Sequence, residues 1–140
     1  MEVLVDTSAW IALFDRNQQY HSLVSITYKS LTTQGSKLIT SDYVIDELLT
    51  NIRKYFDCKR TRTTYELLEL AVANNELSII QTDKPLFDQT KITFFKYFDQ
   101  GLSFTDASIY VLAKNRRIKQ IFTLDSDFAQ IGLITVPTIK

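Results

Sequence analysis

Five acidic residues stand where carboxylates from distant parts of the chain can act together on one ligand. Asp6 directly follows a short apolar run, and Asp125 follows a second such run, with Asp127 two positions further on. Glu47 lies one turn into a predicted helix, and Asp106 lies in the first turn of another, beginning near "SFTDA". Because ligands of parallel α/β sheets bind outside the carboxyl ends of the strands, this placement predicts a shared acidic site.

The chemistry of such a site follows from its charge. Carboxylates that converge on one edge repel one another, so the arrangement is costly unless a cation is bound or some acids are protonated. Oxygen ligands without an accompanying histidine or cysteine set favour Mg²⁺, or alternatively Mn²⁺, over zinc. These metals suit phosphoryl chemistry, in which they activate water and neutralise charge on the phosphate.

Each acid also has an explanation that needs no site. Asp6 can cap the helix that follows it, and Asp106 can interact with a helix dipole. Asp125 suits a turn, and Glu47, like its neighbour Asp46, suits a solvated helix face. Taken singly, these explanations are favoured, but the convergence of four segments on one edge weakens them jointly.

The elements that position these acids alternate between short strands and longer helices. Apolar spacing predicts helices, with one stripe along 45–52 and another at Leu67, Leu70 and Ala71. Strands separated by helices imply right-handed crossovers and an α/β, three-layer domain with a central parallel β-sheet flanked by helices. The first strand is expected at the centre. The predicted strands are 2–5, 37–40, 77–81, 120–124 and 133–136. The predicted helices are 7–14, 20–33, 42–55, 60–74, 84–98 and 104–115, with N-caps at Ser41–Asp42 and Ser103.

Composition sets broader limits. With 140 residues the chain is expected to form one domain, residues 1–140. Sixteen basic and sixteen acidic residues cancel, which neither indicates nor excludes a nucleic-acid partner. A single cysteine, Cys58, cannot form an internal disulfide and fits a reducing, cytoplasmic location. The chain shows no secretion signal and no apolar run approaching 18 residues, so no membrane association is expected.

The motifs "VLVDTSAWIALF", "SDYVIDELL", "LSFTDASI" and "FTLDSDF", in this order, resemble PIN-domain ribonucleases. The nearest resemblance is to VapC-type toxins of bacterial and archaeal toxin–antitoxin systems. The pattern of that family places its four acids on Asp6, Glu47, Asp106 and Asp125, with Asp127 as a possible substitute for the last. The adjacent Asp46 fits the family context less well than Glu47.

This resemblance implies a PIN-like fold and divalent-metal-dependent cleavage of RNA. It implies a small antitoxin that blocks the active site, and a homodimer. Asp6 and Asp106 are then expected to hold Mg²⁺, with help from Glu47 and Asp125 directly or through water. Which acid handles the proton, and whether one or two ions act, is left open. Ser8 and Thr123 occupy positions where such enzymes carry hydroxyls that support the acids.

Two other function classes compete with the ribonuclease. The first is a catalytically silent PIN scaffold that binds RNA or protein, which the complete acid set argues against. The second is a phosphotransfer domain. A receiver needs an acidic pair after strand 1 and an acceptor Asp after strand 3, whereas this chain has Asp6 alone and a shifted Asp83. A phosphatase of the haloacid-dehalogenase type needs D-x-D, where this chain reads "DTS".

Remaining features concern surfaces. Aromatic-rich "TFFKYFD" at 93–99 predicts core packing or a dimer surface rather than base stacking, with Phe94, Phe95 and Phe98 on a buried helix side. Trp10 and Phe14 predict packing of the first helix, where family members often dock the antitoxin. Two basic segments suit contacts to an RNA backbone or, alternatively, solvated helix ends. They are Arg53, Lys54, Lys59, Arg60 and Arg62, and then Lys114, Arg116, Arg117 and Lys119.

Overall fold

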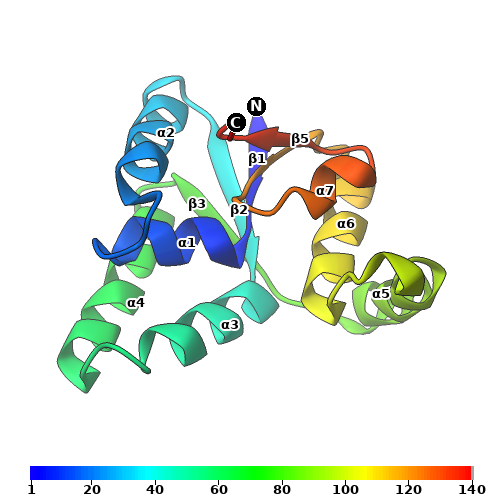
Figure 1. The fold of residues 1–140 in the computed structure, drawn as a ribbon, viewed down its shortest axis with the longest axis horizontal. Helices are drawn as coiled ribbons and strands as arrows, with labels where there is room; N and C mark the ends of the chain where they lie inside the picture. Colours follow the sequence, from blue (N-terminus) through cyan, green and yellow to red (C-terminus); the bar gives the residue numbers. More distant parts are fainter. Residues whose placement is uncertain (140) are drawn as a thin grey trace.

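The computed structural model describes residues 1–139 as a parallel sheet surrounded by helices (Figure 1). The strands are β1 (Glu2–Val5), β2 (Lys37–Ser41), β3 (Leu77–Ile80), β4 (Gln120–Phe122) and β5 (Ile134–Val136). The helices are α1 (Thr7–Phe14), α2 (His21–Thr33), α3 (Asp42–Ile52), α4 (Cys58–Ala73), α5 (Lys84–Lys96), the 3₁₀ helix η1 (Phe98–Gln100), α6 (Phe104–Arg116) and α7 (Asp127–Gln130).

The five strands pair in the order β3-β2-β1-β4-β5, and every pairing is parallel. The predicted α/β fold and the central place of β1 are therefore confirmed. Leu4 on β1 lies opposite Ile39 on one side and Ile121 on the other. The chain adds β2 and β3 to one side of β1 before it returns to add β4 and β5 to the other. The strand order thus reverses between β1 and β4, the place where α/β sheets bind ligands.

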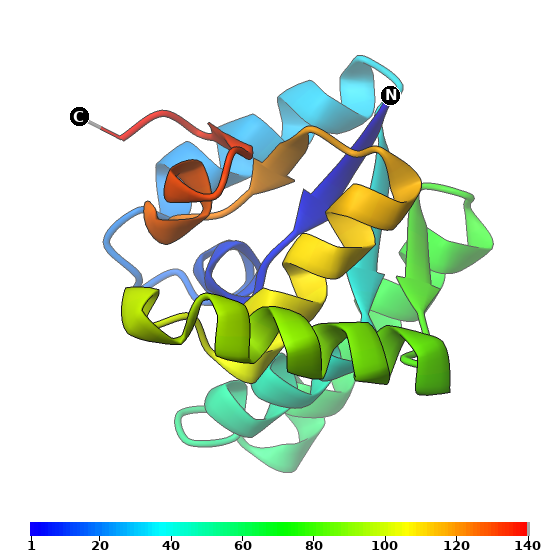
Figure 2. The same cartoon turned by 90° about the vertical axis from the view of Figure 1, so that its right-hand side faces the viewer.

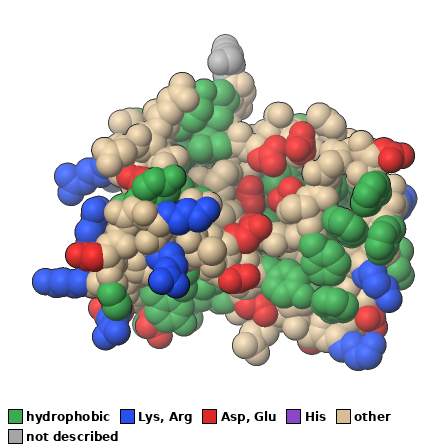
Figure 3. Space-filling view, turned by 60° about the horizontal axis from the view of Figure 1, so that its bottom comes forward, with side chains coloured by type: hydrophobic (Ala, Val, Ile, Leu, Met, Phe, Trp, Pro, Cys, Tyr) green, Lys and Arg blue, Asp and Glu red, His purple; other side chains and the backbone are tan. Residues whose placement is uncertain are grey.

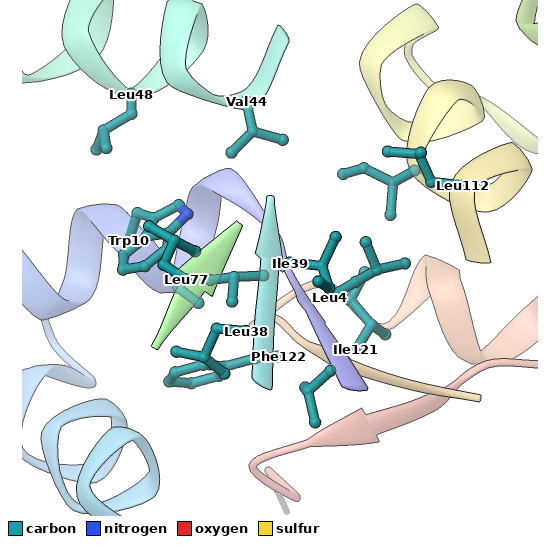
Figure 4. Packing of buried hydrophobic residues seen from close by; sticks show 14 of the residues in the cluster. Leu4, Trp10, Leu38, Ile39, Val44, Leu48, Leu77, Leu112, Ile121 and Phe122 are labelled. Carbon is teal, nitrogen blue, oxygen red and sulfur yellow. The ribbon is translucent and has the colours of Figure 1, made fainter. Parts of the chain in front are cut away.

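The helices form layers around this sheet. In the view of Figure 1, α1 to α4 lie to the left of and below the sheet, and α5 to α7 lie to its right. Seen from that right-hand side, α5 and α6 cross in front of the strands (Figure 2). The core between the layers is apolar, and Leu4, Leu38, Ile121 and Phe122 of the sheet are almost completely buried within it (Figure 4). A parallel sheet covered on both faces explains why its strands are mostly apolar.

Short polar side chains set most helix starts, because the first backbone N–H groups of a helix lack partners within it. The predicted caps Ser41 and Ser103 are confirmed, since their hydroxyls accept from the backbone N–H groups of Val44 and Asp106. Asp57 caps α4 in the same way, so that helix begins before the predicted residue 60.

Several predicted ends differ from the structure. Strand β4 ends at Phe122 rather than at 124, because the Thr123 side chain and the following backbone turn toward α1. Helix α3 ends at Ile52 rather than at 55. The short helix α7 was not predicted, and its N-cap residue, Ser126, makes no side-chain capping bond that could have marked it.

One prediction of burial was wrong. Phe95 and Phe98 are 66% and 60% exposed, so they do not belong to a buried side of α5; Phe94 instead packs against Phe104 with ring centroids 5.7 Å apart. On α4, Leu67 and Leu70 are 49% and 56% exposed. These side chains form apolar surfaces on the outside of the helical layers.

The first helix packs as predicted. The Trp10 and Phe14 rings stack with centroids 6.0 Å apart, and the indole N–H of Trp10 donates to Thr40 Oγ1 at 3.2 Å. His21 has a structural contact, since its Nδ1 lies 2.7 Å from the carbonyl oxygen of Ala12. None of the helices in residues 1–139 has both the length and the apolar content that a membrane crossing requires.

Candidate active site at the carboxyl edge of the sheet

Asp6 is the buried centre of this edge, with only 5% of its surface exposed. It leaves the end of β1 in an extended conformation, and its carboxylate caps α1 by accepting from the Thr7 backbone N–H at 2.7 Å. Its other oxygen, Oδ2, accepts from the hydroxyls of Thr123 at 2.8 Å and Ser8 at 3.2 Å. Strand and hydrogen bonds together fix where this carboxylate points.

Ser8 and Thr123, the predicted supporting hydroxyls, join β1 to the segment after β4. The Ser8 hydroxyl accepts from the Leu124 backbone N–H at 3.0 Å, and the Thr123 hydroxyl accepts from that of Asp125, also at 3.0 Å. The two hydroxyl oxygens lie 3.1 Å apart. This network therefore ties the position of Asp125 to that of Asp6 across the point where the strand order reverses.

Glu47 reaches the same edge from α3. Its Oε1 accepts from the Thr7 hydroxyl at 2.8 Å, which links α3 to the start of α1. Its neighbour Asp46 is exposed and accepts from Thr50 on its own helix at 3.5 Å. Thr7 was missed by the sequence analysis, although its position beside Asp6 in "DTS" was a usable signal. Glu47, rather than Asp46, is thus the acid of α3 that is connected to the site.

Asp106 is fixed by a reciprocal cap at the start of α6. Its backbone N–H donates to the Ser103 hydroxyl at 3.0 Å, and its Oδ2 accepts from the Ser103 backbone N–H at 3.3 Å. Such a capping box satisfies two backbone groups that the helix leaves free and holds the carboxylate at the first turn. Asp106 therefore stabilises the start of a helix, as the explanation that needs no site requires, and this contact is compatible with a role in the site.

The acids interact electrostatically across these elements. Burial, with a smaller contribution from the charge of Asp106, raises the pKa of Asp6 to about 7, against the lowering effect of its hydrogen bonds from Thr123, Thr7 and Ser8. Burial also raises the pKa of Asp106, with further contributions from the negative charges of Asp125 and Glu47. Figure 3 shows acidic side chains gathered along the middle of this face of the molecule.

Asp127 contacts this network through its backbone, whose N–H donates to Asp125 Oδ1 at 2.9 Å. The structure thus brings Asp6, Glu47, Asp106 and Asp125 into one region, and it gives Asp127 the role of holding Asp125 in place. Through that contact Asp127 positions Asp125.

The donor set fits a hard divalent cation. Within residues 1–139, the ion pairs closer than 4.0 Å are Lys84–Asp88 and Arg116–Glu2, so no basic side chain neutralises the acids of this edge. In the same residues no three acidic, histidine or cysteine side chains form a compact ligand set for one ion. Mg²⁺ suits such an arrangement, since it usually keeps several waters and binds through one or two carboxylates.

Fold and site together define an α/β domain that carries an acidic ligand site at its switch point. The family model of the PIN domain matches residues 3–133, and the chain belongs to this family. The chain is 30% identical over 124 residues to "Ribonuclease VapC26" of Mycobacterium tuberculosis. The alignment covers 88% of this chain and 86% of that protein.

Solved structures show the same fold. VapC20 of Mycobacterium tuberculosis, described as a toxin that cleaves the sarcin–ricin loop, superimposes with a TM-score of 0.78 at 19% identity. The alignment covers 94% of this chain and 96% of that one. VapBC2 of Rickettsia felis, crystallised with a fragment of promoter DNA, gives a TM-score of 0.69 at 16% identity, covering 96% of this chain and 97% of the other.

Proposed function

We propose that this protein is a divalent-metal-dependent endoribonuclease, the toxin of a type II toxin–antitoxin pair. The observation that carries the proposal is the buried carboxylate of Asp6, held by three hydrogen bonds beside the negative charge of Asp106. A folded protein keeps such a destabilising arrangement where the charge binds something. The similarity to a protein named as a ribonuclease supports RNA as the substrate.

The residues of the acidic edge have different roles in the proposed reaction. Asp6 and Asp106 hold Mg²⁺, or Mn²⁺ in its place, and Glu47 and Asp125 assist directly or through water. When bound, the cation supplies charge neutralisation at the phosphodiester and lowers the pKa of a water. Thr7 keeps the Glu47 carboxylate oriented toward the site. Glu47 or Asp125 accepts the proton released as water attacks phosphorus, and the bond from phosphorus to the ribose 3′ oxygen breaks, which leaves a 5′-phosphate on one product and, after protonation from solvent, a 3′-hydroxyl on the other.

An apolar surface beside α1 suits an antitoxin. An apolar groove of about 270 Å³ lies between α1, α2 and α4, and Trp10, Phe14, Leu67 and Leu70 contribute to its lining. The two leucines are about half exposed, although they are apolar. Similarity to the VapBC2 complex supports a small protein partner, and we assign it to this groove.

A second copy of the chain is proposed to cover the exposed aromatic face of α5 and η1. Phe95 and Phe98 stack on one another with ring centroids 6.5 Å apart and both stand largely in solvent. Covering them in a homodimer removes this apolar area from water. The single cysteine, Cys58, which has no partner for an internal disulfide, suits a reducing cytoplasm as the location of the toxin and its antitoxin.

The phosphotransfer alternative loses its acceptor. Asp83, the acid that follows β3 in the sequence, caps α5 by accepting from the Leu86 backbone N–H at 3.0 Å. The scaffold alternative predicts that replacing Asp6 leaves cellular toxicity and RNA binding unchanged.

The test is inducible expression without the antitoxin, followed by mapping of RNA 5′ ends. Wild-type protein is expected to arrest growth and to create new RNA ends, and the Asp6→Asn and Asp106→Asn variants are expected to do neither. Glu69→Gln, which changes an exposed acid on α4, serves as the matched control and behaves as wild type. Growth arrest without new RNA ends would rule out the ribonuclease.

A further inference from the structure

A hollow of about 570 Å³ lies between α3 and α4, beside the acidic edge. It shares no lining residue with the apolar groove of α1, α2 and α4. Its walls combine cations, aromatic rings and hydroxyl groups. They include Thr50, Arg53, Phe56, Thr61, Arg62 and Tyr65.

This hollow is continuous with the site along α3. A smaller hollow of about 310 Å³ is lined by Thr7, Glu47 and Thr50, and Thr50 lines the larger hollow as well. Glu47 and Thr50 are three residues apart and therefore share one face of α3, and Lys54, in the turn after the helix, also lines the smaller hollow. Arg53 follows Glu47 by six residues, which is about 9 Å along the helix axis.

The charge of this surface is opposite to that of the acidic edge. Its five cations are exposed, and the ion pairs found within residues 1–139 involve none of them. They are Arg53, Lys54, Lys59, Arg60 and Arg62. In Figure 3, many Lys and Arg side chains lie to the left of the acids, with others at the right-hand edge, and hydrophobic side chains lie on both sides with the larger group to the right. A ligand that spans the acids and the hollow therefore carries repeated negative groups.

Aromatic groups add flat stacking surfaces. The guanidinium carbon of Arg60 lies 3.7 Å from the centroid of the Phe56 ring, and Tyr65 is 38% exposed at the wall of the hollow. Single-stranded nucleic acids are bound by this combination, in which bases stack on aromatic rings and arginines contact the phosphates.

We propose that the hollow between α3 and α4 binds a nucleobase and its phosphate in single-stranded RNA, next to the phosphodiester that lies at the acidic edge. This inference rests on the proposed ribonuclease function and adds where the substrate strand runs. Tyr65 stacks on the base, and Arg53 and Arg62 contact its phosphate. An acidic protein segment would use the same cations but would not require the ring of Tyr65.

The test measures binding by fluorescence anisotropy in an Asp106→Asn background, so that the probe stays intact. Two end-labelled oligomers of equal length and charge are compared: a single-stranded RNA of mixed sequence, and an abasic ribose-phosphate strand. Tyr65→Ala is expected to weaken RNA binding about tenfold, because one stacked base is lost, and to leave the abasic strand unaffected. Arg62→Gln is expected to weaken binding of both strands, since each carries the phosphates.

Matched variants separate stacking from folding. Tyr65→Phe retains the ring and is expected to bind as the parent protein does, while Lys29→Gln changes an exposed cation elsewhere, on α2, and leaves both affinities unchanged. Thermal melting of each variant shows whether it is folded.

Three results would overturn the inference. The first is that Tyr65→Ala lowers the affinity for both strands equally. The second is that Tyr65→Ala lowers neither affinity although the wild type cleaves RNA; the ribonuclease function would then hold, but no base would bind in this hollow. The third is that variants of the residues lining the hollow retain their affinity for RNA but lose binding of the cognate antitoxin, which would make this surface a protein interface. If the wild type neither binds nor cleaves RNA, the proposed function itself fails.

Discussion

The acidic edge and the basic hollow beside it are built in different ways. At the edge, Asp6 is buried at the end of a central strand and receives three hydrogen bonds from neighbouring groups. In the hollow, Arg53 and Arg62 are exposed side chains near the end and the start of two helices. One region holds its carboxylate away from water by hydrogen bonds, whereas the other exposes its charged side chains to water.

This difference indicates what each region is suited to. Fixed carboxylates in a desolvated place interact strongly with a cation, because the local screening by water is weak. Exposed cations contribute mainly non-specific attraction to phosphates, which salt screens. We therefore expect large, all-or-none effects at the edge and smaller, graded effects in the hollow.

The largest effect is expected from Asp6→Asn. The neutral amide can still cap α1, but it removes the buried charge that attracts the cation. Cleavage of RNA by the purified protein is expected to fall by a factor on the order of 10²–10³ or more, as for loss of other preorganised electrostatic groups. A variant that retains more than about a tenth of wild-type cleavage would remove Asp6 from the centre of the site.

A smaller effect is expected from Thr123→Val, which removes a hydroxyl that contacts both Asp6 and the Asp125 backbone. Groups that orient metal-binding residues typically contribute factors of about 10 to 100, and that loss is predicted for the rate of cleavage. Thr64→Val is the matched control, since Thr64 is also buried but bonds only within α4. Equal losses in both variants would show that the effect is one of general stability.

The buried charge also predicts a pH dependence of stability without metal. Since the folded-state pKa of Asp6 is raised from 3.8 to about 7, its contribution is fully present below about pH 4 and is lost as the pH rises through 7. In the presence of a chelator, the free energy of unfolding of the wild type is expected to decrease by up to about 4 kcal/mol between about pH 4 and pH 7, compared with the change in that of Asp6→Asn over the same range.

Chemical denaturation of both proteins at about pH 4 and about pH 8 measures this difference. Added Mg²⁺ is expected to stabilise the wild type more than Asp6→Asn at the higher pH, because a ligand of the folded state stabilises it. A wild type and variant whose stabilities change in parallel would contradict the assignment of Asp6 as a buried charge.

The smallest effect is expected in the basic hollow. Arg62→Gln removes one phosphate contact and is predicted to decrease the slope of log affinity against log salt by about 0.7 for a single strand. Lys114→Gln, on α6, is the control and is expected to leave the slope unchanged. A change of slope in the control alone would mean that the RNA contacts the basic segment at 114–119 instead.

The two regions also differ in how far the sequence predicted them. Asp6, Glu47, Asp106 and Asp125 could be predicted to converge because parallel strands end at one edge, and a covered sheet requires apolar strands. The hydrogen bond of Thr7 to Glu47 spans 40 residues and has no periodic signal. The four acids are brought together by the structure, while their roles toward metal and RNA remain proposals.

Surface features were predicted less well. An apolar stripe is normally the buried face of a helix, but Leu67, Leu70, Phe95 and Phe98 lie on the outside. Periodicity shows which residues share a face and not what covers that face. Likewise, the basic residues at 53–62 could be read from the sequence, but their arrangement around a hollow depends on the angle between α3 and α4.

The central claim is that Asp6 binds a cation needed to cut RNA. Its most direct test is cleavage of single-stranded RNA by purified wild-type and Asp6→Asn protein, each with Mg²⁺ and with a chelator. Cleavage is expected only for the wild type with Mg²⁺. Equal cleavage by Asp6→Asn, or undiminished cleavage by the wild type in the chelator, would contradict the claim.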